Sequence, residues 1–197
     1  MSLVLDATLG IQFPGDVGPI VGFSPFDNTS AVSDVTLQPG ESCYITYTSA
    51  TSIPLYIACG DGQIYELIIT NDSSQTLSPS STAQLYLNPN NTTYTNAFLD
   101  TQLYGESVGG TAAANQNTES SATLGYAPNV FFSRATVSTS TIKKYVHAYA
   151  HAEFAGPSRY NENVWSVWND ITTVWSSLGT LSYGVAHTGT ATVRRIK

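Results

Sequence analysis

Apolar and polar side chains alternate along the stretch KKYVHAYAHAEF, which begins at Lys143. One side of the alternation carries Tyr145, His147, Tyr149, His151 and Glu153, and the other carries Val146, Ala148, Ala150, Ala152 and Phe154. A period of two is typical of a β-strand, whose successive side chains point to opposite faces. Alanine also suits a helix, but Val, Tyr and Phe favour the strand. The pattern predicts a strand with an Ala-rich inner face.

The spacing of His147 and His151 decides whether this stretch is a metal site. On a helix the two rings would lie on adjacent turns and could share one ion. On a strand they lie roughly 13 Å apart, because the chain advances about 3.3 Å per residue, so one ion cannot join them. We therefore expect no metal ligands here. The Tyr/His/Glu face is expected to meet solvent or a partner, and His147 or His151 would make a subunit interface sensitive to pH.

The first part of the chain shows turn signals and short β patterns. Residues 1–40 alternate turn formers with single hydrophobes and predict an extended arm. VTLQPGESCYITYTSA predicts a strand, a Pro-Gly turn and a second strand. SIPLYIACGDGQIYELIIT predicts a hairpin that turns at Gly60–Gly62. Residues 71–82 form a polar connection and a possible internal boundary.

The second part of the chain continues this β pattern. AQLYLNPNNTTYTNAFL predicts another hairpin. Residues 105–129 are rich in small and polar side chains and predict a long ordered loop, either a surface excursion or a segment that grips a neighbouring molecule. After it the pattern is again β to the end of the chain. We expect an all-β fold, an antiparallel β-sandwich of jelly-roll type over residues 41–197.

Composition supports this class and narrows the partners. Only 11% of the residues are charged, and the aromatic supply of 12 Tyr, 7 Phe and 3 Trp favours strands. The net charge is −7, yet the chain ends with Arg194, Arg195 and Lys197. An acidic body argues against nucleic-acid binding. The basic end is either a solvated terminus or a contact with an acidic partner.

The amino terminus MSLVLDATLG lacks the basic region of a signal peptide, and no apolar run is long enough to cross a membrane. We expect a soluble protein made in the cytosol, with no membrane partner. Cys43 and Cys59 are expected in neighbouring strands, where they could face each other. In a reducing compartment free, buried thiols are favoured over a disulfide.

The three tryptophans are candidates for aromatic binding. Trp165 and Trp168 fall on opposite faces of one predicted strand, and Trp175 falls in the next strand segment. Each side chain would lie in the core, anchor an interface or stack on a sugar ring.

No motif of an established catalytic class is found, including phosphate-binding loops and zinc-hydrolase signatures. Glu66 and Glu153 lie inside predicted strands, where they face solvent or a neighbouring subunit, or form half of an acid pair. We expect no cofactor and no enzymatic activity.

The final stretch VWSSLGTLSYGVAHTGTATVRRIK, from Val174 to Lys197, resembles the endings of structural proteins of tailed bacteriophages. In those endings a W-x-S-L-G-T strand, a short turn and a T-V-R-R-I strand recur. The resemblance implies a non-enzymatic virion component that is assembled in the host cytoplasm. We expect a decoration or cement protein that stabilises the lattice of a major capsid protein, as a homo-oligomer and preferably a trimer. A tail-associated fibre or adhesin, or a carbohydrate-binding β-sandwich, is the alternative.

Overall fold

The computed structural model describes residues 4–6, 10–12, 24–72, 82–86, 98–104, 114–119, 122–126, 130–140, 144–153, 159–168 and 175–197. Throughout these ranges the regular elements are strands, and none is a helix. The all-β prediction is therefore confirmed. The strands are β1 (Val4–Asp6), β2 (Gly10–Gln12), β3 (Phe26–Asp27), β4 (Ser42–Pro54), β5 (Ile64–Asp72), β6 (Thr82–Tyr86), β7 (Phe98–Tyr104), β8 (Ala114–Glu119), β9 (Ala122–Tyr126), β10 (Val130–Thr139), β11 (Lys144–Glu153), β12 (Arg159–Trp168) and β13 (Thr180–Arg195).

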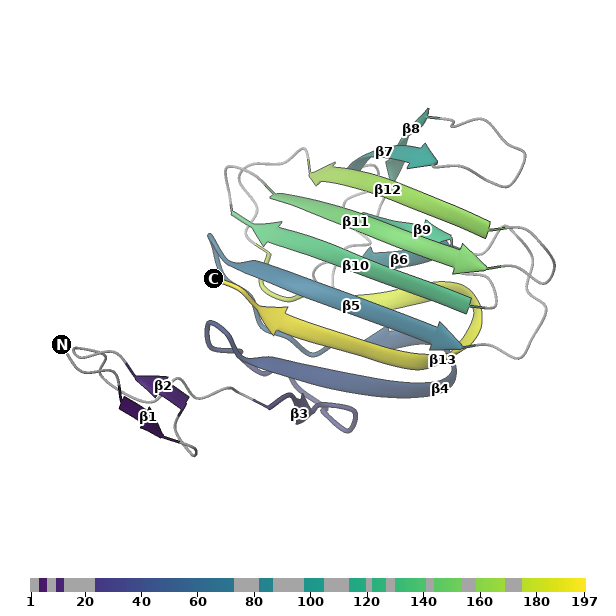
Figure 1. Ribbon diagram of the computed structural model, residues 1–197. Helices are drawn as coiled ribbons and strands as arrows, with labels where there is room; N and C mark the ends of the chain where they lie inside the picture. The colour runs from purple at the N-terminus through teal and green to yellow at the C-terminus, as the bar shows by residue number, and fades with distance from the viewer. Residues whose placement is uncertain are drawn as a thin grey trace.

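All the strands from β3 to β13 belong to one 11-stranded mixed sheet (Figure 1). Its main path runs β3-β4-β13-β5-β10-β11-β12-β7-β8, while β6 pairs with β13 and β9. Neighbouring strands are antiparallel except β3 and β4, which are parallel. Strands β1 and β2 pair with each other in a separate two-stranded sheet.

Strand β13 links two parts of the sheet. One is the main path of strands, which we call the broad sheet, and the other is the pair β6 and β9. The C-terminal half of β13, Gly189–Arg195, lies between β4 and β5, whereas its first residues, Thr180–Tyr183, pair with β6. Between the halves the register with β4 shifts on both sides of His187, and Ser49 of β4 has a positive φ of 49°. Such irregularities bend a strand. As a result β6 and β9 lie behind β10 and β11 in Figure 1.

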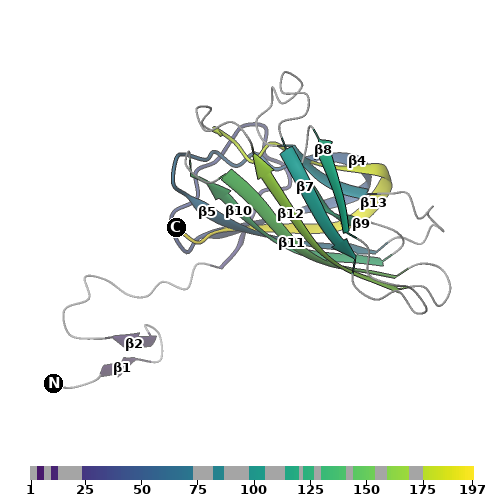
Figure 2. The same ribbon diagram turned by 90° about the horizontal axis from the view of Figure 1, so that it is seen from above.

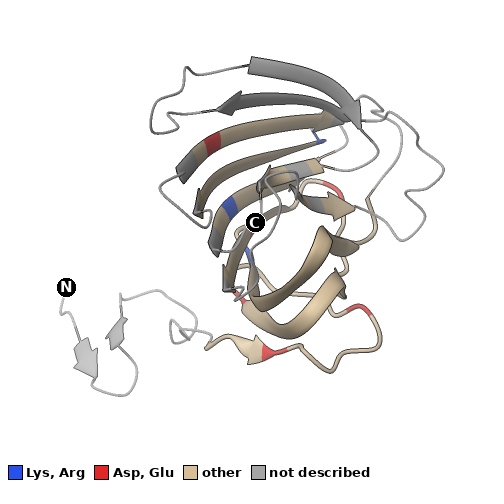
Figure 3. Cartoon of the chain, turned by 90° about the vertical axis from the view of Figure 1, so that its right-hand side faces the viewer, with Lys and Arg blue, Asp and Glu red and all other residues tan. Residues whose placement is uncertain are grey.

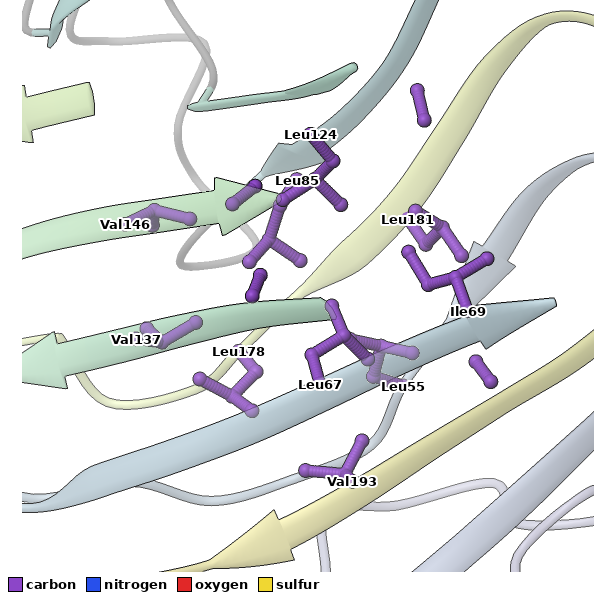
Figure 4. Close-up of a cluster of buried hydrophobic side chains, with 14 of the residues drawn as sticks. Leu55, Leu67, Ile69, Leu85, Leu124, Val137, Val146, Leu178, Leu181 and Val193 are labelled. Atoms are coloured by element: carbon purple, nitrogen blue, oxygen red, sulfur yellow. The ribbon is translucent and has the colours of Figure 1, made fainter. Parts of the chain in front are cut away.

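The main core fills the space between β6 and β9 and the inner face of the broad sheet. Leu85 of β6 and Leu124 of β9 belong to the same buried cluster as Leu67, Val137 and Val146 (Figure 4). Burying each such side chain stabilises the fold by about 1.5–3 kcal/mol. The Ser133 hydroxyl of β10 also donates a hydrogen bond of 2.9 Å to the Leu124 carbonyl.

The alternation predicted for residues 145–153 is confirmed by β11. Val146, Ala148, Ala150 and Ala152 are buried, whereas Tyr149 is exposed and Tyr145, His147 and His151 are half-buried. The inner alanines lack bulk, so β9 packs close to β11.

Two predicted hairpins are wrong in their pairing. The turn near Gly62 exists, with a φ of 74° at that residue, but the residues before it do not pair with β5. Strand β4 ends at Pro54, and Ile57 and Ala58 form isolated bridges with Val35 and Ser177 instead. The second predicted hairpin, AQLYLNPNNTTYTNAFL, would have paired β6 with β7. Instead β6 pairs with β13 and β9, and β7 pairs with β12 and β8. Local sequence signals identify strands and turns, but the choice of partner depends on segments distant in the chain. In the earlier strand-turn-strand prediction, the Pro39–Gly40 turn and β4 are present, and the first strand is reduced to a bridge from Val35 to Ile57.

The predicted loop 105–129 contains β8 and β9, so that prediction is wrong for these residues. Residues of low β propensity form strands here because edge pairing and burial override the intrinsic preference. Ala122 and Leu124, for example, are fully buried.

The N-terminal arm and the domain boundaries stay predictions. Within residues 24–40, β3 pairs with β4 and Leu37 is fully buried, so this part packs on the sheet. Residues 13–23 lie outside the described residues, as does 73–81 in the proposed internal boundary.

Candidate binding face on the broad sheet

Among the described side chains, the outer face of β10, β11 and β12 exposes three aromatic ones. Phe132 is 37% exposed, Tyr149 52% and Trp165 41%, although their strands are hydrogen-bonded on both sides. Figure 2 shows these strands side by side, with β7 beyond β12. We call Phe132, Tyr149 and Trp165 the aromatic diagonal.

The strand register gives the diagonal its geometry. Phe132 lies opposite His151, which is two residues from Tyr149 on β11. Trp165 lies opposite His147, two residues from Tyr149 in the other direction. Each step of the diagonal therefore crosses one strand and shifts by two residues, a separation of about 7–8 Å. The three rings form an oblique line across the sheet.

Trp165 is held by its neighbours on β11. The imidazole of His147 stacks on the indole with ring centroids 3.8 Å apart and planes inclined by 12°. The Tyr145 ring lies 5.9 Å from the indole centroid at a tilt of 42°. Stacked and tilted contacts of this kind stabilise ring positions, so they restrict the rotation of the Trp165 side chain.

Two imidazole–amide hydrogen bonds lie beside the rings. His147 Nε2 is 2.6 Å from Asn163 Oδ1, and His151 Nδ1 is 2.8 Å from Asn161 Oδ1. An amide oxygen can only accept, so in both pairs the ring nitrogen donates. The imidazoles therefore engage Oδ1 of each asparagine and leave the Nδ2 donor out of these two bonds.

An ion pair lies next to the aromatic diagonal. Arg134 of β10, opposite Tyr149, donates from Nε to Glu66 Oε1 at 2.6 Å, and its Nη2 contacts the same oxygen. The Arg134 side chain is 64% exposed and that of Glu66 is 15% exposed. An exposed pair of this kind adds little stability. Its main effect here is that the two charges neutralise each other at the edge of the aromatic diagonal.

The structure brings together only some of the interface residues that were predicted from the sequence. Tyr145, His147, Tyr149 and His151 do lie together on the outer face. Glu153 lies opposite Arg159 at the end of β11, and its side chain is outside the described part of the chain.

The basic carboxyl-terminal residues do not act as one group. Arg194 lies exposed opposite Glu66. Arg195 instead donates from Nη1 to the Leu37 carbonyl at 2.8 Å and from Nε to the Lys197 carbonyl at 3.0 Å. The Lys197 carbonyl in turn accepts from the backbone N–H of Ile64 at 3.1 Å. The last residues thus anchor the chain end to the sheet, a role that their positive charge did not predict.

The tryptophans have separate environments. Trp165 belongs to the aromatic diagonal, whereas Trp175 is fully buried and offers no surface for stacking. As a candidate for aromatic binding Trp175 is therefore wrong, because its ring fills the core. The backbone of Trp168 pairs with Phe98, and its side chain lies outside the described residues.

Sequence reasoning missed several members of this face: Phe132, Arg134, Asn161, Asn163 and Val167. A signal was available, because VFFSRATV and RYNENVWSV both alternate with a period of two. It did not show that these strands flank β11.

The described side chains contain no group of three or more His, Cys, Asp or Glu residues arranged to hold a metal ion. Glu66 is paired with Arg134 and not with a second acid. Charged residues are sparse on the described strands (Figure 3).

Both cysteines are free, with Cys43 buried in β4 and Cys59 half-buried in the connection that follows. The expected placement in neighbouring strands is therefore wrong for Cys59, because β4 ends before it. Burial raises the pKa of the Cys43 thiol to about 11 and that of Cys59 to about 12. Neutral, buried thiols are poor nucleophiles.

Comparisons with models of known protein families, with curated proteins and with solved structures find no match to this chain. Within the ranges described, no helix has the length and apolar character needed to cross a membrane.

Proposed function

We propose that this protein is a non-enzymatic structural protein of a tailed-bacteriophage virion that attaches to another surface through the outer face of β10, β11 and β12. The observation that carries the proposal is the exposure of the aromatic diagonal on strands in the middle of the sheet. Exposed aromatic clusters of this kind mark interaction sites. The virion context comes from the resemblance of residues 174–197 to the endings of phage structural proteins.

The face favours an adhesin of the tail over a cement protein. A lattice-binding face that stays buried is expected to be strongly apolar at its centre. Here each ring has a polar neighbour, such as Asn163 beside Tyr149 and His151 beside Phe132. That composition suits contact that forms and breaks in water.

Decoration of a major capsid protein lattice is the second candidate. Val167 and Ile68 add apolar surface to the same face, and a trimer would present three copies of it to a symmetric lattice. In both roles β6 and β9 would form the second layer of a jelly-roll sandwich, supported by the burial of Leu85 and Leu124.

Immunoelectron microscopy of particles from the producing culture tests the proposal. Label on tail tips is the expected result, and label on heads would favour decoration. Particles that carry no label, together with a virion proteome that lacks this chain, would refute the virion assignment. Light scattering on the purified protein then measures the oligomer, for which a trimer is expected.

A further inference from the structure

The geometry points to a neutral linear glycan as the ligand of the aromatic diagonal, with Phe132, Tyr149 and Trp165 stacking on successive sugar rings and Asn161 and Asn163 bonding to hydroxyls. This inference rests on the proposed binding role of the outer face and names the class of ligand.

The rings provide apolar, planar surfaces in an extended row. A pyranose has one face of C–H groups and a rim of hydroxyls, so it can cover an aromatic ring while its rim stays hydrogen-bonded. Side chains that combine a flat apolar body with few rotatable bonds make such contacts at low entropic cost. Because the three residues occupy diagonal positions about 7–8 Å apart along the backbone of the sheet, the row suits a chain ligand better than a single compact one.

The amides provide polar groups that are already oriented. His147 and His151 each occupy the Oδ1 atom of an asparagine, so Nδ2 of Asn163 and Asn161 remains the hydrogen-bonding group to offer. Ligand sites generally combine apolar walls with a few placed polar groups of this kind. The stacking of His147 on Trp165 fixes one ring and one amide with the same side chain.

Charge complementarity selects a neutral ligand. Among the described side chains, the diagonal and the two imidazole–amide pairs contain no carboxylate, ammonium or guanidinium group. The adjacent Arg134 is bound to Glu66. Nucleic acids and acidic polysaccharides require a dense array of cations, whereas the described side chains of this face provide only Arg134, which is paired with Glu66, and Arg194 opposite Glu66 on β13. An uncharged polyol needs no charged partner, so it can bind to this face without leaving a buried charge unpaired.

Isothermal titration calorimetry and a glycan array with neutral and acidic oligosaccharides test the inference on the full chain. We expect binding to a neutral oligosaccharide, weakened at least tenfold in Trp165→Ala and Tyr149→Ala and several-fold in Asn163→Ala. Val32→Ala is the matched control, because Val32 is an exposed hydrophobe in the segment between β3 and β4, away from the diagonal. Thermal unfolding confirms that each variant is folded.

Several outcomes would overturn the inference and leave the proposed function in place. One is the absence of neutral-glycan binding by a protein that still labels virions and attaches to host cells. Others are binding to acidic glycans alone, or a dimer that Tyr149→Arg dissociates, which would make a second copy the occupant. If the diagonal variants bind the neutral glycan as tightly as wild type, the site lies elsewhere. Loss of virion labelling, in contrast, removes the proposed function and not the glycan site.

Discussion

The imidazole of His147 lies flat on the indole of Trp165 across the β11–β12 pair, with ring centroids 3.8 Å apart. A double-mutant cycle with His147→Ala and Trp165→Ala should give a favourable coupling of about 0.5–1.5 kcal/mol in urea unfolding. The cycle isolates the stack because the hydrogen bond from His147 to Asn163 is lost equally with and without Trp165. Strictly additive effects would mean that the two rings do not stack in solution.

The alternation in β11 allowed its two faces to be predicted, since a period of two is local information. Val146 and Ala148 are buried and Tyr149 is exposed, as the sequence indicated. Strand pairing could not be predicted in the same way. No local signal near β4 or β5 indicates that β13 lies between them. Residues 114–126 also lack the apolar content of a typical strand.

Only part of the candidate site could be predicted, because the pairing of its strands is not local information. Trp165 and His147 were both identified, but their contact depends on the register of β12 against β11, which is set by packing across the whole sheet. Phe132 enters the site only because β10 is the other neighbour of β11. The sequence left Trp175 open between the core, an interface and a sugar-binding surface, because an exposed tryptophan and a core tryptophan have the same local pattern; the structure places it in the core.

Gly189 is required by a close approach of backbone to backbone. A Cβ placed on it would lie 2.2 Å from the Thr70 carbonyl oxygen and 2.7 Å from Asn71 Oδ1. Gly189→Ala should therefore destabilise the protein by about 3 kcal/mol or more, since β5 must move. Gly184→Ala in the same strand is the control: a Cβ there meets nothing within 4 Å, and its effect should stay below about 1 kcal/mol. Chemical denaturation measures both, and equal effects would contradict the packing of β13 on β5.

Asn71 joins two tyrosines where β13 bends. Its Oδ1 accepts hydrogen bonds from the hydroxyls of Tyr47 and, at 3.2 Å, Tyr183, and all three residues are buried. Asn71→Ala should lower the free energy of unfolding by about 1–3 kcal/mol, because buried hydroxyls lose their acceptor. The exposed Asn163→Ala should change it by less than about 0.5 kcal/mol. A small effect at Asn71 would show that the two hydroxyls satisfy each other through their own 2.8 Å contact.

The same cluster predicts loss of stability in alkali. Burial raises the pKa of Tyr47 to about 12 from 10.0 and also raises the pKa of Tyr183. Unfolded tyrosines ionise near pH 10 while the folded ones keep their protons, so this stability is fully present below pH 10 and is lost as the pH rises toward 12. Urea midpoints measured from pH 8 to pH 11.5 should fall, and the fall should be shallower in Tyr47→Phe. An equally steep fall in that variant would exclude Tyr47 as a contributor.

The two thiols should be unreactive in the folded protein. Burial, with the nearby Glu41 and Asp34 carboxylates, raises the pKa values of Cys43 and Cys59 to about 11 and 12, so almost no thiolate exists at pH 8. Iodoacetamide should modify neither residue in native buffer and both after denaturation, as mass spectrometry of the intact chain would measure. Cys59→Ser is the matched variant, and it should take up one label when unfolded. If the unfolded wild-type chain gains label only after a reductant is added, Cys43 and Cys59 form a disulfide. That result would contradict the free thiols of the structure.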